Sequence, residues 1–173
     1  VAPWLQSSDL PVDDVTFPIF ASRQDQIAQA LKSLSTMGVP EIGVVYASQR
    51  EHRQHQRDVE NACATLGIKL KSVNLTQDLA SVGQKLPADT PHILLFVGGT
   101  PELVQFLGGA DQQAQRHYVV ALANVNLNTM LQMGATKRTP VMATQVVPMV
   151  NSPASIVKSY REALVRFFDE PPT

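Results

Sequence analysis

Short apolar runs alternate along the chain with longer segments in which apolar residues recur every three or four positions. The clearest run is Ile93–Val97, which is typical of a strand buried on both faces of a parallel sheet. Comparable runs predict buried strands at 41–47 and 117–123 and a further strand at 140–147. The alternation at 68–75 predicts an edge strand, and Pro18 places a short predicted strand at 15–20 at an edge or a crossover.

Apolar stripes predict helices between these strands. The expected helices span 22–38, 48–67, 78–86, the segment from 100 to the glycines at 108–109, 127–134 and a last segment from 152. Ser22 and Asp25 have the spacing of a capping box. At the start of the helix that follows the Ile93–Val97 strand, Thr100 is expected to cap the free amides, Pro101 to take the first helical position and Glu102 to complement the helix dipole.

Two helices carry features of their own. The helix at 48–67 begins with residues that are polar on all sides, so its first turns are predicted to project beyond the core or to lie at a solvated rim. The last helix is expected to be capped by Ser152, to open at Pro153 and to stop at 171–172. Its apolar stripe consists of Ile156, Tyr160, Leu164 and Phe167.

This order of elements predicts the fold class. Strands that alternate with helices at this spacing favour an α/β fold with an open, mostly parallel sheet and helices on both faces, of the Rossmann-like kind. We expect an extended entry segment at 1–16, one domain at 17–170 and a tail at 171–173. A length of 173 residues suits one domain with a substantial core.

Composition narrows the function classes. The chain is 44% apolar, yet no apolar run approaches the roughly 18 residues that a membrane helix needs. A net charge of -1 gives no electrostatic footprint for nucleic acid or an anionic membrane. The single cysteine, Cys63, excludes an internal disulfide and is expected to fill the core. Because the sequence begins at Val1, we expect a processed product or an excised piece.

Three loops follow the central strands and are predicted to meet at one edge of the sheet, where open α/β folds bind ligands. They contain residues 48–51, 98–100 and 123–125. Gly98 and Gly99 have two interpretations: plain turn glycines, or a cradle for a small polar or carboxylate-bearing ligand at a helix start. The loop lacks the Lys-Ser/Thr of a phosphate-binding P-loop and the third glycine of a dinucleotide fingerprint.

No catalytic residue or metal ligand set is predicted. His52 and His55 lie three residues apart near Glu51 and Asp58, a pattern that we interpret as a solvated charged helix start rather than a metal site. The serines lack a Gly-x-Ser-x-Gly elbow. We expect His92 and His117 to lie at strand ends. Core positions are expected for the tyrosines, which are Tyr46, Tyr118 and Tyr160. Trp4 could be an interface residue.

Two segments of the chain resemble a known family. The pattern Phe-x-x-x-Ala-Ser at 17–22, the following helix and the Ile-Gly-Val-Val-Tyr strand are similar to the second lobe of type 1 periplasmic solute-binding proteins. These are the leucine/isoleucine/valine-binding receptors of ABC importers. The segments Gln145-Val-Val-Pro-Met-Val-Asn-Ser-Pro153 and Ile156-Val-Lys-Ser-Tyr-Arg-Glu-Ala-Leu164 are the most specific match. The resemblance covers residues 17–168, and 1–10 resembles the end of a first lobe.

The resemblance implies a single ligand-binding lobe of a two-lobed clamp that closes by hinge motion around an amino acid or a related small molecule. The other lobe is expected before Val1, and a return segment after Thr173. The implied partners are a small-molecule ligand and the membrane permease of an ABC importer, and the implied location is the periplasm. The resemblance implies no enzymatic activity and no cofactor, nor any binding of nucleic acid or insertion into a membrane.

Carried over loop by loop, the resemblance implies ligand contacts at seven positions: Ser48, Gln49, Glu51, Gly98, Gly99, Thr100 and Asn124. Two hallmarks of amino-acid recognition are replaced here. Glu51 and His52 stand where an aromatic-glycine pair is usual, and Asn124 stands near the usual acidic contact for the ligand ammonium. A ligand other than a branched-chain amino acid is therefore as well supported. The alternatives are an effector-sensing domain of a regulator or signalling receptor with the same fold and, ranked last, a nucleotide- or flavin-binding α/β enzyme.

Overall fold

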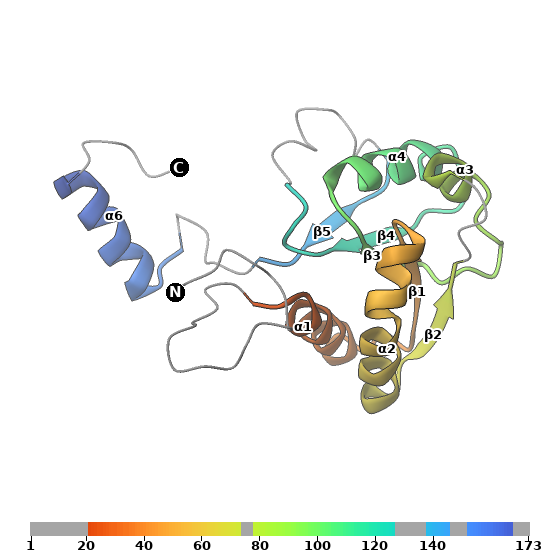
Figure 1. The fold of residues 1–173 in the computed structure, drawn as a ribbon, viewed down its shortest axis with the longest axis horizontal. Coiled ribbons are helices and arrows are strands. Elements are labelled where there is room, and N and C mark those ends of the chain that lie inside the picture. The colour runs from red at the N-terminus through yellow and green to blue at the C-terminus, as the bar shows by residue number, and fades with distance from the viewer. Residues whose placement is uncertain (1–20, 74–77, 127–137, 146–151, 168–173) are drawn as a thin grey trace.

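The computed structural model describes residues 21–73, 78–126, 138–145 and 152–167, with one open sheet and helices against both of its faces (Figure 1). Every neighbouring pair of strands is parallel, in the order β2-β1-β3-β4-β5. The strands are β1 (Glu41–Tyr46), β2 (Lys69–Ser72), β3 (Ile93–Val97), β4 (Tyr118–Ala121) and β5 (Val141–Ala143). The predicted α/β fold with a parallel sheet is confirmed, and β2 is an edge strand as expected.

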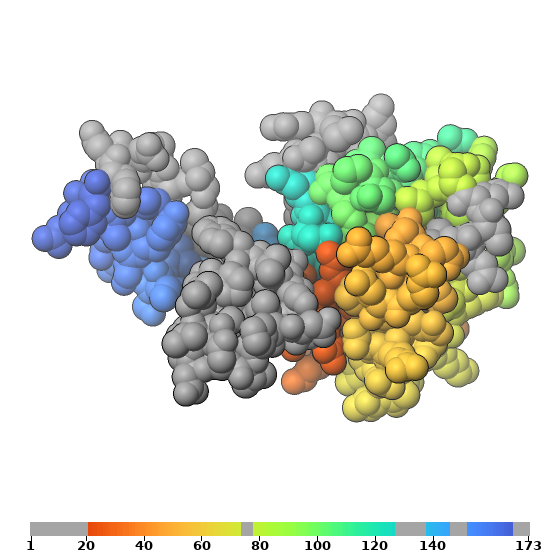
Figure 2. Space-filling model, in the orientation of Figure 1, coloured from red at the N-terminus to blue at the C-terminus, as the bar shows by residue number. Residues whose placement is uncertain are grey.

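Five helices lie in the described parts of the chain. They are α1 (Arg23–Thr36), α2 (Gln49–Leu66), α3 (Leu79–Gln84), α4 (Thr100–Ala110) and α6 (Ser155–Phe167). Helices α1 and α2 cover one face of the sheet, and α3 and α4 cover the other. Figure 2 shows α2, in orange and yellow, across much of the face turned to the viewer.

The apolar strand runs are explained by the two cores that they separate. Alternate residues of a strand point to opposite faces, so Leu95 and Val97 of β3 pack under α1 and α2 while Leu94 and Phe96 pack under α3 and α4. Both sets are fully buried. A strand covered on both faces must be apolar at every position, which is the pattern that the sequence shows.

Local signals position the helix ends. The Ser22 hydroxyl accepts from the Asp25 amide at 3.1 Å and the Asp25 carboxylate accepts from the Ser22 amide at 3.3 Å, which confirms the capping box. Gly38 and Gly67 have φ angles of 77° and 68°, a left-handed conformation that glycine adopts without a steric penalty. Helices α1 and α2 therefore end where the sequence predicts.

Two predicted helix starts are wrong in detail. Gly99, not Thr100, is the N-cap of α4, and Thr100 is the first helical residue. The last helix begins at Ser155, two residues beyond Pro153, although the Ser152 hydroxyl does accept a hydrogen bond from the Ala154 amide at 3.3 Å. The predicted strand at 15–20, the predicted helix at 127–134, Trp4 and the ends of the chain at 1–16 and 171–173 lie outside the described residues.

Helix α6 stands apart from the helices that cover the sheet (Figure 1). Its Val157 is buried, but Ile156 and Phe167 are 71% and 69% exposed and Tyr160 is half exposed. Tyr118 on β4 is half exposed as well, so the core positions predicted for Tyr118 and Tyr160 are wrong, whereas Tyr46 is buried as expected. Helical periodicity identifies an apolar stripe but not the surface that covers it. None of the helices in the described ranges is long and apolar enough to cross a membrane.

Helices α3 and α4 approach each other closely through two glycines. A Cβ on Gly109 would overlap the carbonyl oxygen of Ala80, and a Cβ on Gly83 would lie 2.7 Å from the Ala110 amide nitrogen. The backbones of the two helices are therefore in direct contact. Gly108, next to Gly109 on α4, has open space around the position of a Cβ.

We predict that Gly109→Ala lowers the free energy of unfolding by about 1–3 kcal/mol, because a methyl group there forces the two helix backbones apart. Gly108→Ala is the matched control and should leave stability unchanged or raise it by up to about 1 kcal/mol, since alanine favours helix more than glycine does. Urea unfolding followed by circular dichroism measures both. Equal effects of the two substitutions would contradict the close helix contact.

His117 lies just before β4, at the edge of the sheet where the strands begin, and is only 2% exposed. Its Nδ1 lies 3.2 Å from the Pro91 carbonyl oxygen, to which it can only donate. Burial lowers the pKa of His117, and the nearby His92 lowers it further, against the opposing effect of the Pro91 hydrogen bond. The folded protein therefore holds this imidazole neutral at pH values where the unfolded chain protonates it.

Because the folded-state pKa of His117 is below the unfolded value, its contribution to stability is complete above about pH 6.5 and is lost as the pH falls below that value. We expect the free energy of unfolding to decrease between pH 7 and the lower folded-state pKa. His117→Gln keeps an N–H donor for Pro91 but cannot titrate, so this decrease should be smaller. The exposed His92 is the control position, and His92→Gln should retain most of the pH dependence. Urea titrations at several pH values test this.

Candidate functional site

The sheet has a topological switch point between β1 and β3. Helix α2 follows β1 on one face of the sheet and α4 follows β3 on the other, so the segments after these two strands leave the carboxyl edge toward opposite faces. Ligands of open α/β sheets bind in the crevice that this divergence creates. The first two predicted loops lie at this point, because the Ala47 amide donates to the Val97 carbonyl at 2.9 Å.

Gly98 is required for the packing of these loops. A Cβ at this position would overlap the Cβ of Ala47 and lie 2.7 Å from Cε1 of Phe96. At Gly99 the nearest group would be the Glu102 carboxylate, which is the mobile end of a side chain. The simple interpretation of Gly98 as a packing glycine is thus sufficient, whereas Gly99 is the residue that leaves space at the start of α4.

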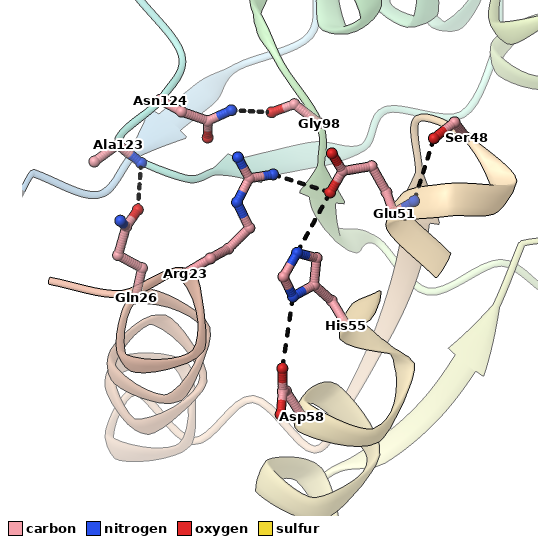
Figure 3. Close-up of polar contacts among 9 residues, drawn as sticks. All are labelled: Arg23, Gln26, Ser48, Glu51, His55, Asp58, Gly98, Ala123 and Asn124. Carbon is pink, nitrogen blue, oxygen red and sulfur yellow. Dashed lines mark hydrogen bonds and ion pairs between the residues drawn. The ribbon is translucent and has the colours of Figure 1, made fainter. Parts of the chain in front are cut away.

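Two hydrogen bonds join the second loop to the third. The Asn124 side chain donates from Nδ2 to the Gly98 carbonyl at 2.7 Å, and the Asn126 amide donates to the Thr100 hydroxyl at 2.9 Å. Figure 3 shows Asn124 reaching across to Gly98. The side-chain oxygen of Asn124 is buried and has no hydrogen-bond partner among the residues that the structure describes. Thr100 therefore braces a loop instead of capping α4, and Asn124 keeps one acceptor for another group.

The start of α4 is less suited to an anion than its sequence suggests. Its N-cap is a glycine, so no side chain caps the free amides of the first turn, which by itself favours an anion. Glu102 lies in that turn, however, and its negative charge already complements the positive end of the helix. A phosphate or carboxylate placed here would be repelled by this side chain. The expected cradle for a carboxylate-bearing ligand at residues 98–100 is therefore disfavoured.

The first loop supplies a capped helix start and a paired carboxylate. Ser48 is the N-cap of α2, and its hydroxyl accepts from the Glu51 amide at 3.2 Å. Gln49, the first residue of the helix, is exposed. The Glu51 carboxylate is not open to solvent on all sides, as a solvated helix start would have it, because it is 24% exposed and ion-paired with Arg23 at 3.0 Å.

A chain of charged groups continues from this pair along the contact of α1 with α2 (Figure 3). Nε2 of His55 lies 3.5 Å from the same Glu51 oxygen that Arg23 contacts, and Nδ1 of His55 lies 3.5 Å from Asp58. One side of the polar first turns of α2, with Glu51 and His55, is thus partly buried against α1, while Ser48, Gln49 and Arg50 are exposed, as the predicted solvated rim would have them. The sequence pattern identified the polar residues but not the cationic partner from another helix.

His52 belongs to a different environment from His55. Its ring packs on Tyr46, with ring centroids 4.8 Å apart. Burial raises the pKa of the Tyr46 hydroxyl, and the negative charges of Glu60 and Asp58 raise it further, so this phenol stays neutral. Burial likewise raises the pKa of the Cys63 thiol to about 11, in agreement with its predicted core role. Within the described ranges, no three His, Cys, Asp or Glu side chains are arranged to hold a metal ion.

Gln26 is a functional position that the sequence pattern missed. It is buried in the second turn of α1, where its Oε1 accepts from the Ala123 amide at 3.0 Å and its Nε2 donates to the Ala21 carbonyl at 3.0 Å. It therefore anchors the third loop to α1. A helix that packs antiparallel to the strands begins at their carboxyl edge, so the topology itself points to the first turns of α1. The sequence interpretation considered only loops that follow strands.

The structure thus brings the predicted contacts together in part. Gly98, Thr100 and Asn124 belong to two loops that are joined directly, and the first loop meets them through Ala47. Glu51 lies on the α1 side of the crevice with Arg23, and Ser48 and Gln49 remain at the exposed start of α2. Arg23 and Gln26 are the residues of this edge that were not predicted.

We predict that Gln26→Ala lowers the free energy of unfolding by about 1–3 kcal/mol, because it leaves the part-buried Ala123 amide without its Gln26 partner and opens space in the buried Gln26 position. Amide hydrogen exchange at Ala123 should accelerate in the same variant. Gln24→Ala is the control, since Gln24 lies on the same helix and is exposed, and it should change stability by less than about 0.5 kcal/mol. Unchanged exchange at Ala123 in the Gln26 variant would contradict the anchoring role.

Comparison with known proteins is informative at the level of the fold. No protein-family model matches the sequence, and no curated protein matches it significantly. Among solved structures, an extracellular ligand-binding receptor from Verminephrobacter eiseniae is similar, with a TM-score of 0.73 at 17% identity. A substrate-binding periplasmic protein from Ralstonia solanacearum has a TM-score of 0.69 at 18% identity, and an ABC transporter substrate-binding protein from Desulfitobacterium hafniense has 0.68 at 16%.

The coverage of these matches is unequal. They include 91%, 96% and 91% of this chain but only 47%, 49% and 46% of the receptor, the periplasmic protein and the transporter protein, respectively. The chain spans about half the length of the structures that it matches. Identities this low show a common fold and nothing finer. This chain therefore has the fold of one half of an extracellular ligand-binding receptor of the ABC substrate-binding type.

Proposed function

We propose that the chain is one lobe of a two-lobed receptor for a small solute, which binds at the carboxyl edge of the sheet while the second lobe closes over it. The observation that carries this proposal is the arrangement of the loops at the switch point. They are joined to one another by Asn124 and Gly98 and anchored to α1 by Gln26, so the contact groups are held in place before any ligand arrives.

The structural neighbours support the same class of function. Their names describe binding proteins and not enzymes, and the Desulfitobacterium hafniense protein was solved in complex with Leu. Solute binding requires no reacting group, only a shaped edge and a few polar contacts. An amino acid or another small molecule of that size is the ligand class that we propose for this edge.

The surface of α6 is consistent with a further lobe. An amphipathic helix that stands clear of the sheet with exposed Ile156 and Phe167 presents apolar area that a solvated domain surface rarely leaves open. We propose that the receptor works outside the cytoplasm. Its proposed partner is the permease of an ABC importer, to which the receptor would deliver the solute. Hinge closure would bring the second lobe to the exposed starts of α2 and α4.

The nucleotide alternative is disfavoured by charge. Glu102 occupies the helix start at which a phosphate would bind, and its carboxylate would repel one. An effector-sensing domain with this fold would bind a solute at the same edge. A solute-binding experiment therefore tests the site whether the chain belongs to a transport receptor or to a regulator.

Thermal denaturation in the presence of L-leucine tests the proposal. A ligand that binds only the folded state, present at ten times its Kd, stabilises by about 1.4 kcal/mol, which raises Tm by about 3–6 °C for a chain of this size. We expect such a shift with L-leucine and its loss in Asn124→Ala, which removes the buried acceptor and the bond to Gly98.

Asn61→Ala, on the exposed surface of α2 far along the helix from its start, is the control and should bind as the unchanged chain does. Because one lobe leaves the ligand half solvated, millimolar ligand concentrations are needed. A shift with ATP or FMN and none with L-leucine would overturn the proposal and favour the nucleotide alternative.

A further inference from the structure

Arg23 is sheltered at the proposed binding edge although it belongs to none of the loops that follow strands. Helix α1 starts at this edge, and Arg23 lies three residues before Gln26, which places both side chains on neighbouring positions of one helix face. Gln26 contacts the third loop through the Ala123 amide. Figure 3 shows the Arg23 guanidinium between Glu51 of α2 and the loops that carry Ala123 and Asn124.

The guanidinium is held by one contact and has capacity for more. The Arg23 side chain is 19% exposed, and its Nη1 donates to Oε2 of Glu51 at 3.0 Å. Within the described parts of the chain this is its one hydrogen bond, whereas a guanidinium carries five N–H donors. Arg binds carboxylates best when two parallel N–H groups meet both oxygens. A second carboxylate would supply that geometry by sharing the guanidinium with Glu51, through the N–H groups that Glu51 leaves unused.

Glu51 can hold the Arg23 side chain in place while it leaves most of the guanidinium N–H groups available. Its Oε2 also lies 3.5 Å from Nε2 of His55. The Glu51 carboxylate is therefore held between Arg23 and His55. This makes Glu51 a positioning residue for Arg23, in place of the direct ligand contact that the sequence predicted.

Other cationic and dipolar groups at this edge are less suitable. Arg50 projects from the first turn of α2 into solvent, where an ion pair contributes little. The positive end of α4 is matched by Glu102. Asn124 contributes a buried acceptor oxygen, which cannot bind a carboxylate but can accept from a donor elsewhere on the ligand.

We infer that Arg23 is the contact for a carboxylate group of the solute, and that the receptor edge therefore selects carboxylate-bearing solutes. This inference rests on the proposed function. It adds to that function a specific contact for the ligand carboxylate, which it places on α1 and not on the Gly98–Gly99 loop or the start of α4.

Three probes of one shape test the assignment by thermal shift and calorimetry: L-leucine, 4-methylpentanoate, which lacks the ammonium group, and L-leucinamide, which lacks the carboxylate. We expect both carboxylates to bind and L-leucinamide to bind at least about tenfold more weakly than L-leucine. Arg23→Gln should weaken both carboxylates by about 10- to 100-fold, the range of a charge-assisted hydrogen bond. Arg23→Lys should recover only part of this, because a lysine cannot form the bidentate contact.

Arg50→Gln is the matched control, since it removes the same charge from the same edge at an exposed position, and it should leave all three affinities unchanged. Circular dichroism confirms folding of each variant. Carboxylates that bind equally well after Arg23→Gln, or L-leucinamide that binds as tightly as L-leucine, would overturn the Arg23 assignment and leave the proposed function standing. Failure of all three probes with the unchanged chain would overturn both.

Discussion

The pairing of β1 with β3 is the contact on which the rest of the molecule depends. These strands are neighbours in the sheet from Gly43 and Leu94 to Tyr46 and Val97, although the sequence between them forms a helix, an edge strand and another helix. Their pairing sends the chain to opposite faces after each strand and so places a topological switch point at the carboxyl edge. The Ala47–Val97 hydrogen bond and the packing of Gly98 against Ala47 extend the pairing into the loops.

Much of the polar chemistry at this edge serves the edge itself. The Gly98 carbonyl, the Thr100 hydroxyl and the Ser48 hydroxyl each accept a hydrogen bond from a neighbouring group of the protein. These bonds occupy groups that are only partly buried or exposed, so they stabilise the loops modestly. They also fix the loops, so a ligand does not have to order them on binding. Among the described residues of this edge, the Arg23 guanidinium and the side-chain oxygen of Asn124 keep hydrogen-bonding capacity, which is why the proposed recognition is assigned to them.

The helix pairs on the two faces of the sheet meet in different ways. On the α1–α2 side, polar side chains of both helices meet in the chain of contacts from Arg23 through Glu51 and His55 to Asp58. On the α3–α4 side, Gly83 and Gly109 allow the helix backbones to touch. The first pair is therefore joined in part through long side chains, and the second directly through the backbone.

The sequence by itself determined the parallel α/β fold, the order of its elements and the ends of its first two helices. Buried strands must be apolar throughout, and capping residues act over three or four positions, so these signals are local. It also identified the three loops of the edge. Only the tertiary structure decided that Thr100 braces a loop, that Glu51 is paired with Arg23 and that Gln26 anchors Ala123. These contacts join residues 26 to 97 positions apart, and which donor meets which acceptor depends on the packing of α1 beside α2 and above the strands.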